Sequence, residues 1–278
     1  MVFFVRFHLE NNKVFLLQDT HCTQRGTVLV EHIQNALNMF PLPSDHRSRT
    51  FVIDLEDFAN ENISSDFCIA TVPEKAHTLF PDSYSFAWPQ VGIPSVQDLS
   101  LQMFERGQLP PKDQRVVWLG VITHPNRRVF LERCRLPDLA DRVDAREVIW
   151  SNPYRPLLSL PDHADYKYLI DIEGAGWSAR IKYLLCAGRP TFITERPFWD
   201  WVTWDLVPWK HYIPVARDCS DLLEKMDWAE QHAEEAETIA KAGQELMMQR
   251  LKYETLYRAM HDLLLSKLQT ECEQIQNA

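Results

Sequence analysis

The chain has 278 residues, of which 45% are hydrophobic, 24% are charged and 11% are aromatic. This composition supplies enough apolar side chains for a buried core, at a length that fits one large domain or two smaller ones. The net charge is −10 at pH 7 and no basic stripe runs along the sequence, which argues against nucleic acid as a partner. No stretch approaches the roughly 18–20 apolar residues of a membrane span, so we expect no transmembrane segment.

The six cysteines lie far apart in the sequence and form no C-x-x-C pair. Zinc sites built from cysteine use such short spacings, so the pattern argues against a zinc site. Residues 1–8 carry an arginine early and only a short apolar run, which does not fit a signal peptide. We therefore expect a cytoplasmic protein.

The first half of the chain alternates strand and helix patterns. We predict strands over residues 2–9, 14–18, 51–53 and 67–70, and a helix over residues 27–40. Asn11 and Asn12 favour a hairpin turn between the first two strands. This succession indicates the first half-domain of an α/β protein.

The second half contains further strands and longer helices. We predict helices over residues 96–106, 221–249 and 254–268, and strands over residues 116–120 and 145–150. Ser220 is the predicted N-cap of the helix that follows it. Residues 80–97 are rich in proline and aromatic side chains and predict a long ordered loop, a kind of segment that often has a function.

Residues 166–194 follow the pattern of a βαβ unit: strand, glycine turn, helix, turn and strand. The strand ends before Gly174 and Gly176, and Ser178 is the predicted N-cap of the helix. A glycine turn that opens a helix exposes backbone N–H groups, and the helix dipole favours an anion there. Arg180 adds a planar fork of donors that suits a phosphate. An ordinary βα connection, whose glycines only make the turn, fits the spacing equally well.

Two blocks of sequence identify the family that this chain resembles. The first lies in residues 165–194 and has the order Tyr-Lys-Tyr-Leu, acid, Gly, Trp-Ser, Arg, Lys-Tyr-Leu-Leu, and the second is LVPWKHYIPV at residues 206–215. Together they resemble glycosyltransferase family 90, the CAP10-like family, which includes the Rumi-type protein O-glucosyltransferases and O-xylosyltransferases. The compact chain is also similar to virus-encoded members that build capsid glycans. The alternative to a cytoplasmic protein is therefore a soluble viral protein in its host cell.

The resemblance implies an α/β fold of the GT-B type, with two Rossmann-like halves that face a cleft. We assign residues 1–110 to the N-terminal half, which presents the acceptor. Residues 111–218 are assigned to the C-terminal half, which binds the donor. Residues 219–278 are assigned to C-terminal helices that pack back across both halves.

The resemblance also implies a reaction, the inverting transfer of a sugar from a UDP-sugar to a hydroxyl of a glycan or glycoprotein acceptor. UDP-xylose is the favoured donor and UDP-glucose the next. The charge on the leaving UDP can be stabilised by a metal held in an acid-x-acid loop, or by backbone amides with arginine or lysine. The glycine turn supplies the second kind, so we expect no metal and no cofactor.

The family pattern marks eight candidate site residues. Asp57 aligns with the catalytic base, which takes the proton of the acceptor hydroxyl; Asp54 and Glu56 crowd the same turn, so the assignment stays open among the three. The residues assigned to the donor are Gly174, Gly176, Ser178, Arg180, Thr123, Arg127 and Asp200, with Arg128 as the alternative to Arg127.

The chain departs from the family pattern after the strand at residues 116–120, where Leu119 and Ile122 stand in place of arginines. An inactive glycan-binding or scaffold relative is therefore one alternative. The sequences at residues 171–173 and 54–56 each resemble an acid-x-acid metal loop, so a metal-dependent glycosyltransferase with a single nucleotide-binding domain is another.

Overall fold

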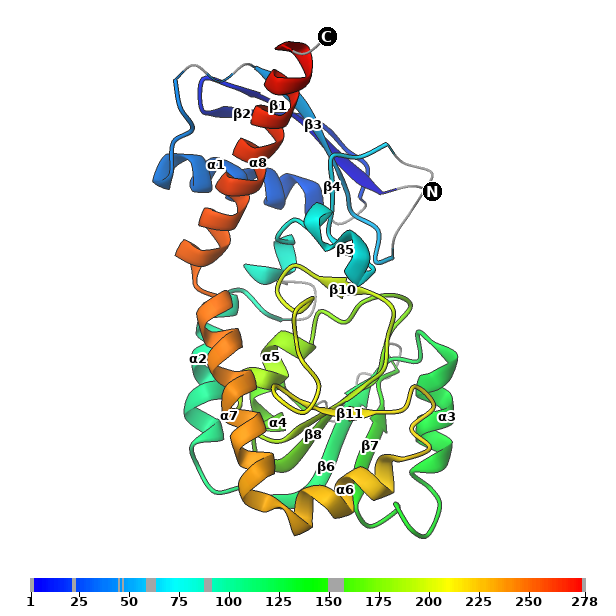
Figure 1. Ribbon diagram of the computed structural model, residues 1–278. Coiled ribbons are helices and arrows are strands. Elements are labelled where there is room, and N and C mark those ends of the chain that lie inside the picture. Colours follow the sequence, from blue (N-terminus) through cyan, green and yellow to red (C-terminus); the bar gives the residue numbers. More distant parts are fainter. Residues whose placement is uncertain are drawn as a thin grey trace. The chain divides into compact units, whose positions relative to one another are not determined.

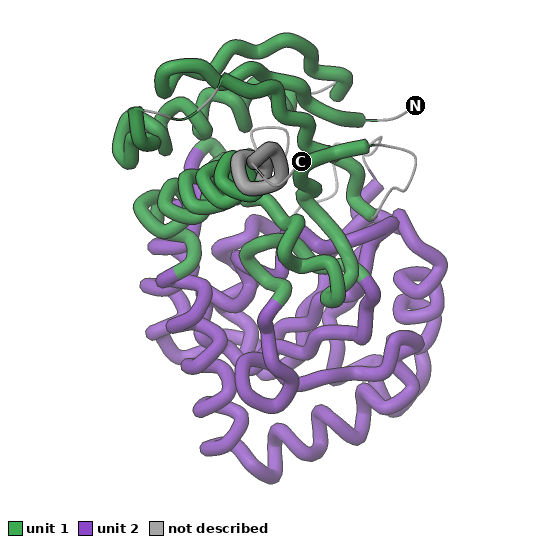
Figure 2. Tube along the Cα trace, turned by 45° about the horizontal axis from the view of Figure 1, so that its top comes forward, with its two compact units in different colours: residues 1–94, 198–204, 250–278 green, residues 95–197, 205–249 purple. Residues whose placement is uncertain are grey.

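The chain folds into two compact units, each assembled from separate stretches of sequence. The computed structural model describes residues 3–21, 24–44, 46, 48–58, 64–87, 92–149 and 158–276. Unit 1 comprises residues 1–94, 198–204 and 250–278, and unit 2 comprises residues 95–197 and 205–249 (Figure 2). These limits differ from the predicted segments, because the C-terminal helices are divided between the units.

Unit 1 is built on a four-stranded sheet in the order β2-β1-β3-β4 (Figure 1). The strands are β1 Phe4–Glu10, β2 Lys13–Asp19, β3 Arg49–Asp54 and β4 Phe67–Cys68. The predicted hairpin is confirmed: Asn11 and Asn12 have φ angles of 50° and 60°, as a tight two-residue turn requires. Because such a turn reverses the chain, β1 is antiparallel to β2, and it is antiparallel to β3 as well; only β3 and β4 pair in parallel. The sheet therefore corrects the prediction of a Rossmann-like half for residues 1–110.

The remainder of unit 1 packs helices and short segments around this sheet. These elements are α1 Arg25–Met39, β5 Ala70–Thr71, η1 Pro73–Thr78, η2 Ser83–Ser85, β10 Trp199–Asp200 and α8 Tyr253–Gln276. The helix predicted over residues 27–40 is confirmed as α1, and it packs on α8 from the other end of the chain. The strand predicted over residues 67–70 is divided into β4 and β5, and β5 pairs with β10 in a separate two-stranded sheet.

Unit 2 contains a five-stranded sheet in the order β11-β9-β8-β6-β7, in which all neighbours are parallel. The strands are β6 Asp113–Gly120, β7 Val143–Glu147, β8 Tyr166–Asp171, β9 Thr191–Thr194 and β11 Ile213–Val215. The predicted strands at residues 116–120 and within residues 166–194 are confirmed. The strand predicted over residues 145–150 forms as β7, and Trp150 lies outside the described residues.

Helices bury both faces of this sheet. They are α2 Val96–Gly107, α3 Pro125–Arg133, α4 Leu160–His163, α5 Ile181–Cys186, α6 Leu222–Gln231 and α7 Ala233–Arg250. Alternate strand side chains, such as Trp118 and Ile170, join side chains of α3, α6 and α7 in one apolar core. The intervening side chains, such as Val117 and Leu169, are buried too, and α2 packs on α5. Burial on both faces is the arrangement expected of a parallel sheet.

Two helix limits differ from the prediction. The helix predicted over residues 221–249 is interrupted at His232, where α6 ends and α7 begins. The N-cap of α6 is Asp221 and not Ser220. The Asp221 carboxylate accepts a hydrogen bond from the Ala216 N–H, so this side chain closes the turn before the helix.

Candidate functional site

The order of the strands in unit 2 indicates where its sheet would bind a ligand. Along the chain the strands run β6, β7, β8, β9, β11, and β6 is flanked by β7 on one side and β8 on the other. The connections therefore leave β6 and β8 in opposite directions. In open parallel sheets, ligands bind at the carboxyl ends of the strands where such a reversal occurs. The loops that follow β6 and β8 meet at this switch point.

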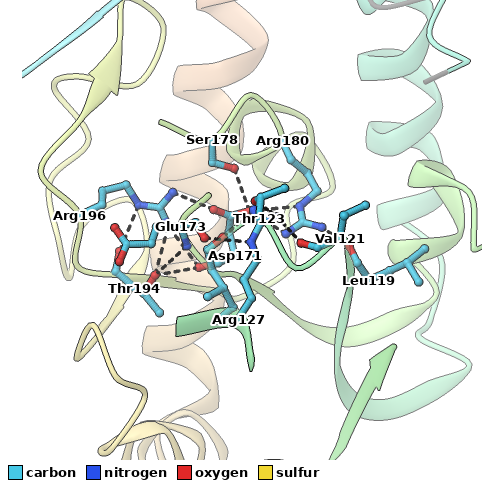
Figure 3. A network of polar contacts seen from close by, with 11 residues as sticks. Leu119, Val121, Thr123, Arg127, Asp171, Glu173, Ser178, Arg180, Thr194 and Arg196 are labelled. Carbon is cyan, nitrogen blue, oxygen red and sulfur yellow. Dashed lines mark hydrogen bonds and ion pairs between the residues drawn. The ribbon is translucent and has the colours of Figure 1, made fainter. Parts of the chain in front are cut away.

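The predicted donor residues gather on these two loops. Thr123 and Arg127 follow β6, whereas Ser178 and Arg180 follow β8 (Figure 3). Gly174 also follows β8. The contact between the loops is direct, because Arg127 Nε donates to the Glu173 carbonyl at 2.9 Å. Within the loop after β6, Arg127 Nη1 donates to the Thr123 hydroxyl at 3.0 Å. Gly176, in the same loop as Gly174, is also buried.

The centre of the cluster is Asp171, the last residue of β8, whose side chain is fully buried. Its carboxylate accepts hydrogen bonds from Ser178 Oγ at 3.0 Å, Arg180 Nη2 at 3.0 Å and Arg196 Nη1 at 2.8 Å (Figure 3). Burial by itself would raise the pKa of Asp171, but the charges of Arg196, Arg180 and Arg127 outweigh it and hold that pKa below its usual range. Asp171 is therefore an ionised carboxylate that fixes the arginines around it.

Arg127 ties the two loops together through the backbone. Besides Thr123 and Glu173, it donates to the carbonyls of Val121 at 2.8 Å and Ile172 at 3.0 Å. Burial lowers the pKa of Arg127 to about 10, and repulsion from Arg180 adds to the shift. Arg128, the alternative in the sequence, is exposed. The structure therefore brings Arg127, and not Arg128, into the cluster.

Positive charge exceeds negative charge at this place. Arg217 binds Glu173 from the other side, with Nε at 2.5 Å from Oε1, and Asn126 Nδ2 binds the same oxygen at 2.5 Å. The arginines of the cluster are Arg127, Arg180, Arg196 and Arg217, and its carboxylates are those of Asp171 and Glu173. The four guanidinium groups thus carry two charges more than the two carboxylates, a balance that favours an anion.

The helix at this site corrects two expectations. Ser178 is not an N-cap, because α5 begins at Ile181 with Arg180 in the cap position, and the Ser178 hydroxyl donates to Asp171. Since α5 has only six residues, the predicted anion site at its N-terminus lacks a helix of useful length. The Arg180 side chain, 16% exposed, also donates to the Leu119 carbonyl and thereby joins β8 to β6.

Gly174 lies beside the Arg127 side chain. A Cβ atom at this position would be 3.3 Å from Arg127 Nη2 and 3.5 Å from Thr123 Oγ1. The glycine therefore leaves the space beside these two donors open.

Asp57 belongs to a second charged cluster, within unit 1. Its side chain is 54% exposed and accepts a hydrogen bond from Arg25 Nη1 at 3.2 Å. Arg25 is buried and clamps the buried carboxylate of Asp82 with two hydrogen bonds of 2.9 and 2.8 Å. The other two acids of the turn have partners on the backbone, since Asp54 accepts from the Glu56 N–H and Glu56 accepts from the Phe3 N–H.

Asp200, predicted as a ribose acceptor, is buried in unit 1. Its carboxylate accepts hydrogen bonds from the Thr203 N–H at 3.0 Å and from the Thr203 hydroxyl. These bonds close the turn that follows β10. Within unit 1, the structure thus gives Asp200 a local structural contact.

Sequence reasoning missed three partners, namely Arg25, Asp82 and Arg196. Arg25 and Asp82 are 57 residues apart, and Arg196 is 25 residues from Asp171. No local pattern marks such pairs. The sequence offers one general clue to such partners: a carboxylate that is predicted to be buried needs a cation nearby.

Side chains that could bind a metal are dispersed over the described part of the chain. There, no three His, Cys, Asp or Glu side chains are grouped so that they could hold a metal ion. The described helices include none with the length and apolar character needed to cross a bilayer.

Comparison with known proteins links the chain to one family. The model of the family described as "Glycosyl transferase family 90" matches residues 59–276. Protein O-glucosyltransferase 2 of Danio rerio is 38% identical over 113 residues, which are 40% of this chain and 23% of that protein. Protein O-glucosyltransferase 1 of Rattus norvegicus is 28% identical over 162 residues, 55% of this chain and 41% of the relative. The matches thus span less than half the length of these curated relatives.

Two solved structures are similar at low identity. The C-terminal domain of the glycosyl transferase group 1 family protein LpcC from Francisella tularensis has 10% identity and a TM-score of 0.36, over 54% of this chain and 92% of that chain. Anabaena Alr3699/HepE in complex with UDP-glucose has 13% identity and a TM-score of 0.39, over 65% and 47%. Neither likeness is close enough to bear on the function of this chain.

Proposed function

Because the chain belongs to glycosyl transferase family 90, we propose that it transfers a sugar from a UDP-sugar to a hydroxyl group of a glycan or glycoprotein. The observation that carries the proposal is the arginine-rich cluster at the switch point of unit 2, where two positive charges exceed the carboxylates. A nucleoside diphosphate is the anion that a UDP-sugar presents, and a parallel sheet binds nucleotides at this edge.

Arg180 is the proposed principal contact of the diphosphate. Two of its nitrogens, Nε and Nη2, share one oxygen of Asp171, and Nη1 holds the Leu119 carbonyl. The guanidinium is therefore fixed before the donor arrives. A fixed cation stabilises the charge that develops on UDP as the bond to the sugar breaks, with little reorganisation. Thr123 and Arg127 border the same space, and Gly174 leaves room for the donor to approach them.

Asp57 is the proposed base. It takes the proton from the acceptor hydroxyl while the acceptor oxygen attacks the anomeric carbon, and UDP leaves with the electrons of the broken bond. Attack from the face opposite to UDP inverts the configuration at that carbon. Of the three acids in the turn, Asp57 has the exposed side chain, whereas Asp54 is buried. The cleft expected between the two halves stays a prediction.

The proposed reaction needs no divalent metal. The two carboxylates of the acid-x-acid sequence, Asp171 and Glu173, are each held by arginine, and a metal ion would have to compete with these contacts. The arginines supply the positive charge that a metal would otherwise bring to the diphosphate.

The sugar that the donor carries is glucose or xylose in this proposal. Relatives named protein O-glucosyltransferases favour glucose, whereas the resemblance to virus-encoded members favours xylose. One CH₂OH group separates the two sugars, and a pocket distinguishes such a difference by only about 1–3 kcal/mol. UDP-glucose and UDP-xylose are therefore both in the first panel of donors.

Release of UDP in EDTA tests this function. We expect the wild type to turn over at least one UDP-sugar with a glycan or glycoprotein acceptor, and both Arg180→Ala and Asp57→Ala to abolish the turnover. Arg128→Ala is the matched control, because Arg128 is exposed and neighbours Arg127 without joining the cluster. Turnover that requires an added divalent cation would favour the metal-dependent alternative. Binding of UDP or a glycan without turnover of any donor would favour the inactive relative.

A further inference from the structure

Unit 2 has a cavity at the edge of the sheet opposite to the switch point. Its volume is about 360 Å³, and its lining comes from the amino ends of β8 and β9, the segment after α2, and the helices α6 and α7. The strands are parallel, so their amino ends and carboxyl ends lie at opposite edges. This amino-edge cavity is therefore separate from the proposed donor site, and nothing in the proposed reaction uses it.

Small residues leave the cavity unfilled. Ala229, Ala233 and Ala236 of α6 and α7 line it, and each contributes only a methyl group to that wall. Gly188 contributes the opposite wall with a φ angle of 63°, and a Cβ atom there would lie 2.5 Å from Gln244 Nε2. A larger residue at Gly188 is thus excluded both by the backbone conformation and by the buried Gln244 amide.

One lining residue lacks a hydrogen-bond partner. Tyr168, the third residue of β8, is only 2% exposed, and its hydroxyl meets no partner among the described residues. The ring is fixed by Phe192, with centroids 5.9 Å apart. A buried hydroxyl without a partner destabilises the folded state, because it gives up its hydrogen bonds to water. A polar group of a bound ligand that reached the Tyr168 hydroxyl would supply the missing hydrogen bond.

The charged groups around the cavity are mainly cations. Lys167, Arg189 and Lys241 line it together with one acid, Glu237. Arg189 is bound to the carbonyls of Ala164 and Leu109, so its charge is held in place without a carboxylate contact. Within the part of the chain that the structure describes, no ion pair joins Lys167 or Lys241 to a carboxylate. The rim therefore offers three positive charges against one negative charge.

We propose that the amino-edge cavity binds a small phosphate monoester that carries hydroxyl groups, such as a monosaccharide phosphate. Phosphate suits the three cations, and Tyr168, Glu237 and the Gln108 amide offer hydrogen bonds to hydroxyl groups. A volume of about 360 Å³ is near the lower end of ligand pockets, which matches a single phosphorylated sugar better than a nucleotide sugar.

Titration calorimetry with glucose 6-phosphate, inorganic phosphate and glucose tests the proposal. We expect glucose 6-phosphate to bind more tightly than phosphate or glucose alone, since it uses both the cations and the hydrogen-bonding groups. Tyr168→Phe removes only the hydroxyl, and we expect about fivefold weaker binding with an unchanged or higher melting temperature. Lys241→Gln should also weaken binding, by about threefold to tenfold.

Two further variants distinguish a ligand in the amino-edge cavity from one bound elsewhere on the chain. Ala233→Phe fills the cavity from an exposed position on α7, so it should abolish binding while the protein stays folded. Lys13→Gln removes the same charge as Lys241→Gln from an exposed strand of unit 1 and should bind as the wild type does. No saturable binding of glucose 6-phosphate would overturn the proposal. So would wild-type binding by Tyr168→Phe and Ala233→Phe, or loss of this binding in Arg180→Ala, which would place the ligand at the switch point.

Discussion

In each unit, the candidate functional side chain contacts a buried charged group, and these two buried groups have opposite sign. In unit 2 the buried group is the Asp171 carboxylate, which Arg180 and Arg196 contact. In unit 1 it is the Arg25 guanidinium, which Asp82 and Asp57 contact. The first cluster is left with excess positive charge and the second with excess negative charge.

The difference decides which kind of group each cluster presents to solvent. In unit 2 the partly exposed members include the arginines Arg180 and Arg217, and in unit 1 the exposed member is Asp57. A cation held on a buried carboxylate suits a diphosphate, and a carboxylate held on a buried arginine suits the hydroxyl of an acceptor. The two halves of the proposed reaction thus need the two opposite clusters.

Replacing the exposed acid should have the largest effect. Asp57→Asn removes the proposed base, so we expect turnover to fall by about 10²–10⁴-fold. The free energy of unfolding should change by less than about 0.5 kcal/mol, because the side chain is more than half exposed. Glu74→Gln, another exposed acid of unit 1, is the control and should keep full turnover. If Asp57→Asn keeps wild-type turnover, Asp57 is not the base of the reaction.

Replacing the buried acid should act on stability first. Asp171→Asn leaves the fully buried Arg196 and its neighbour Arg180 without their carboxylate, so we expect about 3–5 kcal/mol loss in the free energy of unfolding. Urea denaturation measures it, with Asp141→Asn as an exposed control. A loss below about 1 kcal/mol would mean that the cluster does not depend on Asp171.

Acidification should reproduce part of that loss in the wild type. The pKa of Asp171 is lower in the folded protein than its ordinary value, so its contribution to stability is complete above the ordinary carboxyl pKa of about 3.9. The contribution falls as the pH drops below that value and through the lowered pKa. The wild type should therefore lose more stability below about pH 4 than Asp171→Asn does. Parallel pH curves for the two proteins would contradict this.

The smallest change is one methyl group at the switch point. Gly174→Ala puts a Cβ atom 3.3 Å from Arg127 Nη2, so the guanidinium must move by a few tenths of an ångström. We expect the KM for the donor to rise by about threefold to tenfold with little change in stability. Ala175→Ser, at the exposed neighbouring position, should leave the KM unchanged. If both variants behave alike, the space beside Gly174 is not used by the donor.

The features that the sequence predicted well are local ones. Asn11 and Asn12 specify a hairpin by themselves, and the strand–turn–helix–strand order of residues 166–194 follows from periodicity and glycine. The family pattern also placed Thr123, Arg127 and Arg180 on loops that the fold brings together.

The features that the sequence did not predict depend on tertiary contacts. Ser178 has the residue type of an N-cap, but Asp171 competes for its hydroxyl once β8 and the loop fold together. The hairpin predicts that β1 and β2 are antiparallel, but longer segments join β3 to them, so local patterns did not reveal that β3 is antiparallel to β1. The pairing of Arg25 with Asp82 spans 57 residues and leaves no local pattern.

The central claim is that the cluster around Asp171 holds the diphosphate through Arg180. Titration of UDP in EDTA against the wild type, Arg180→Lys and Arg128→Ala tests it most directly. We predict that the wild type binds UDP without metal. We also predict that Arg180→Lys binds about tenfold more weakly, because lysine cannot hold Asp171, Leu119 and a phosphate at once, and that Arg128→Ala binds normally. Equal binding by Arg180→Lys, or binding by the wild type only after a divalent cation is added, would contradict the claim.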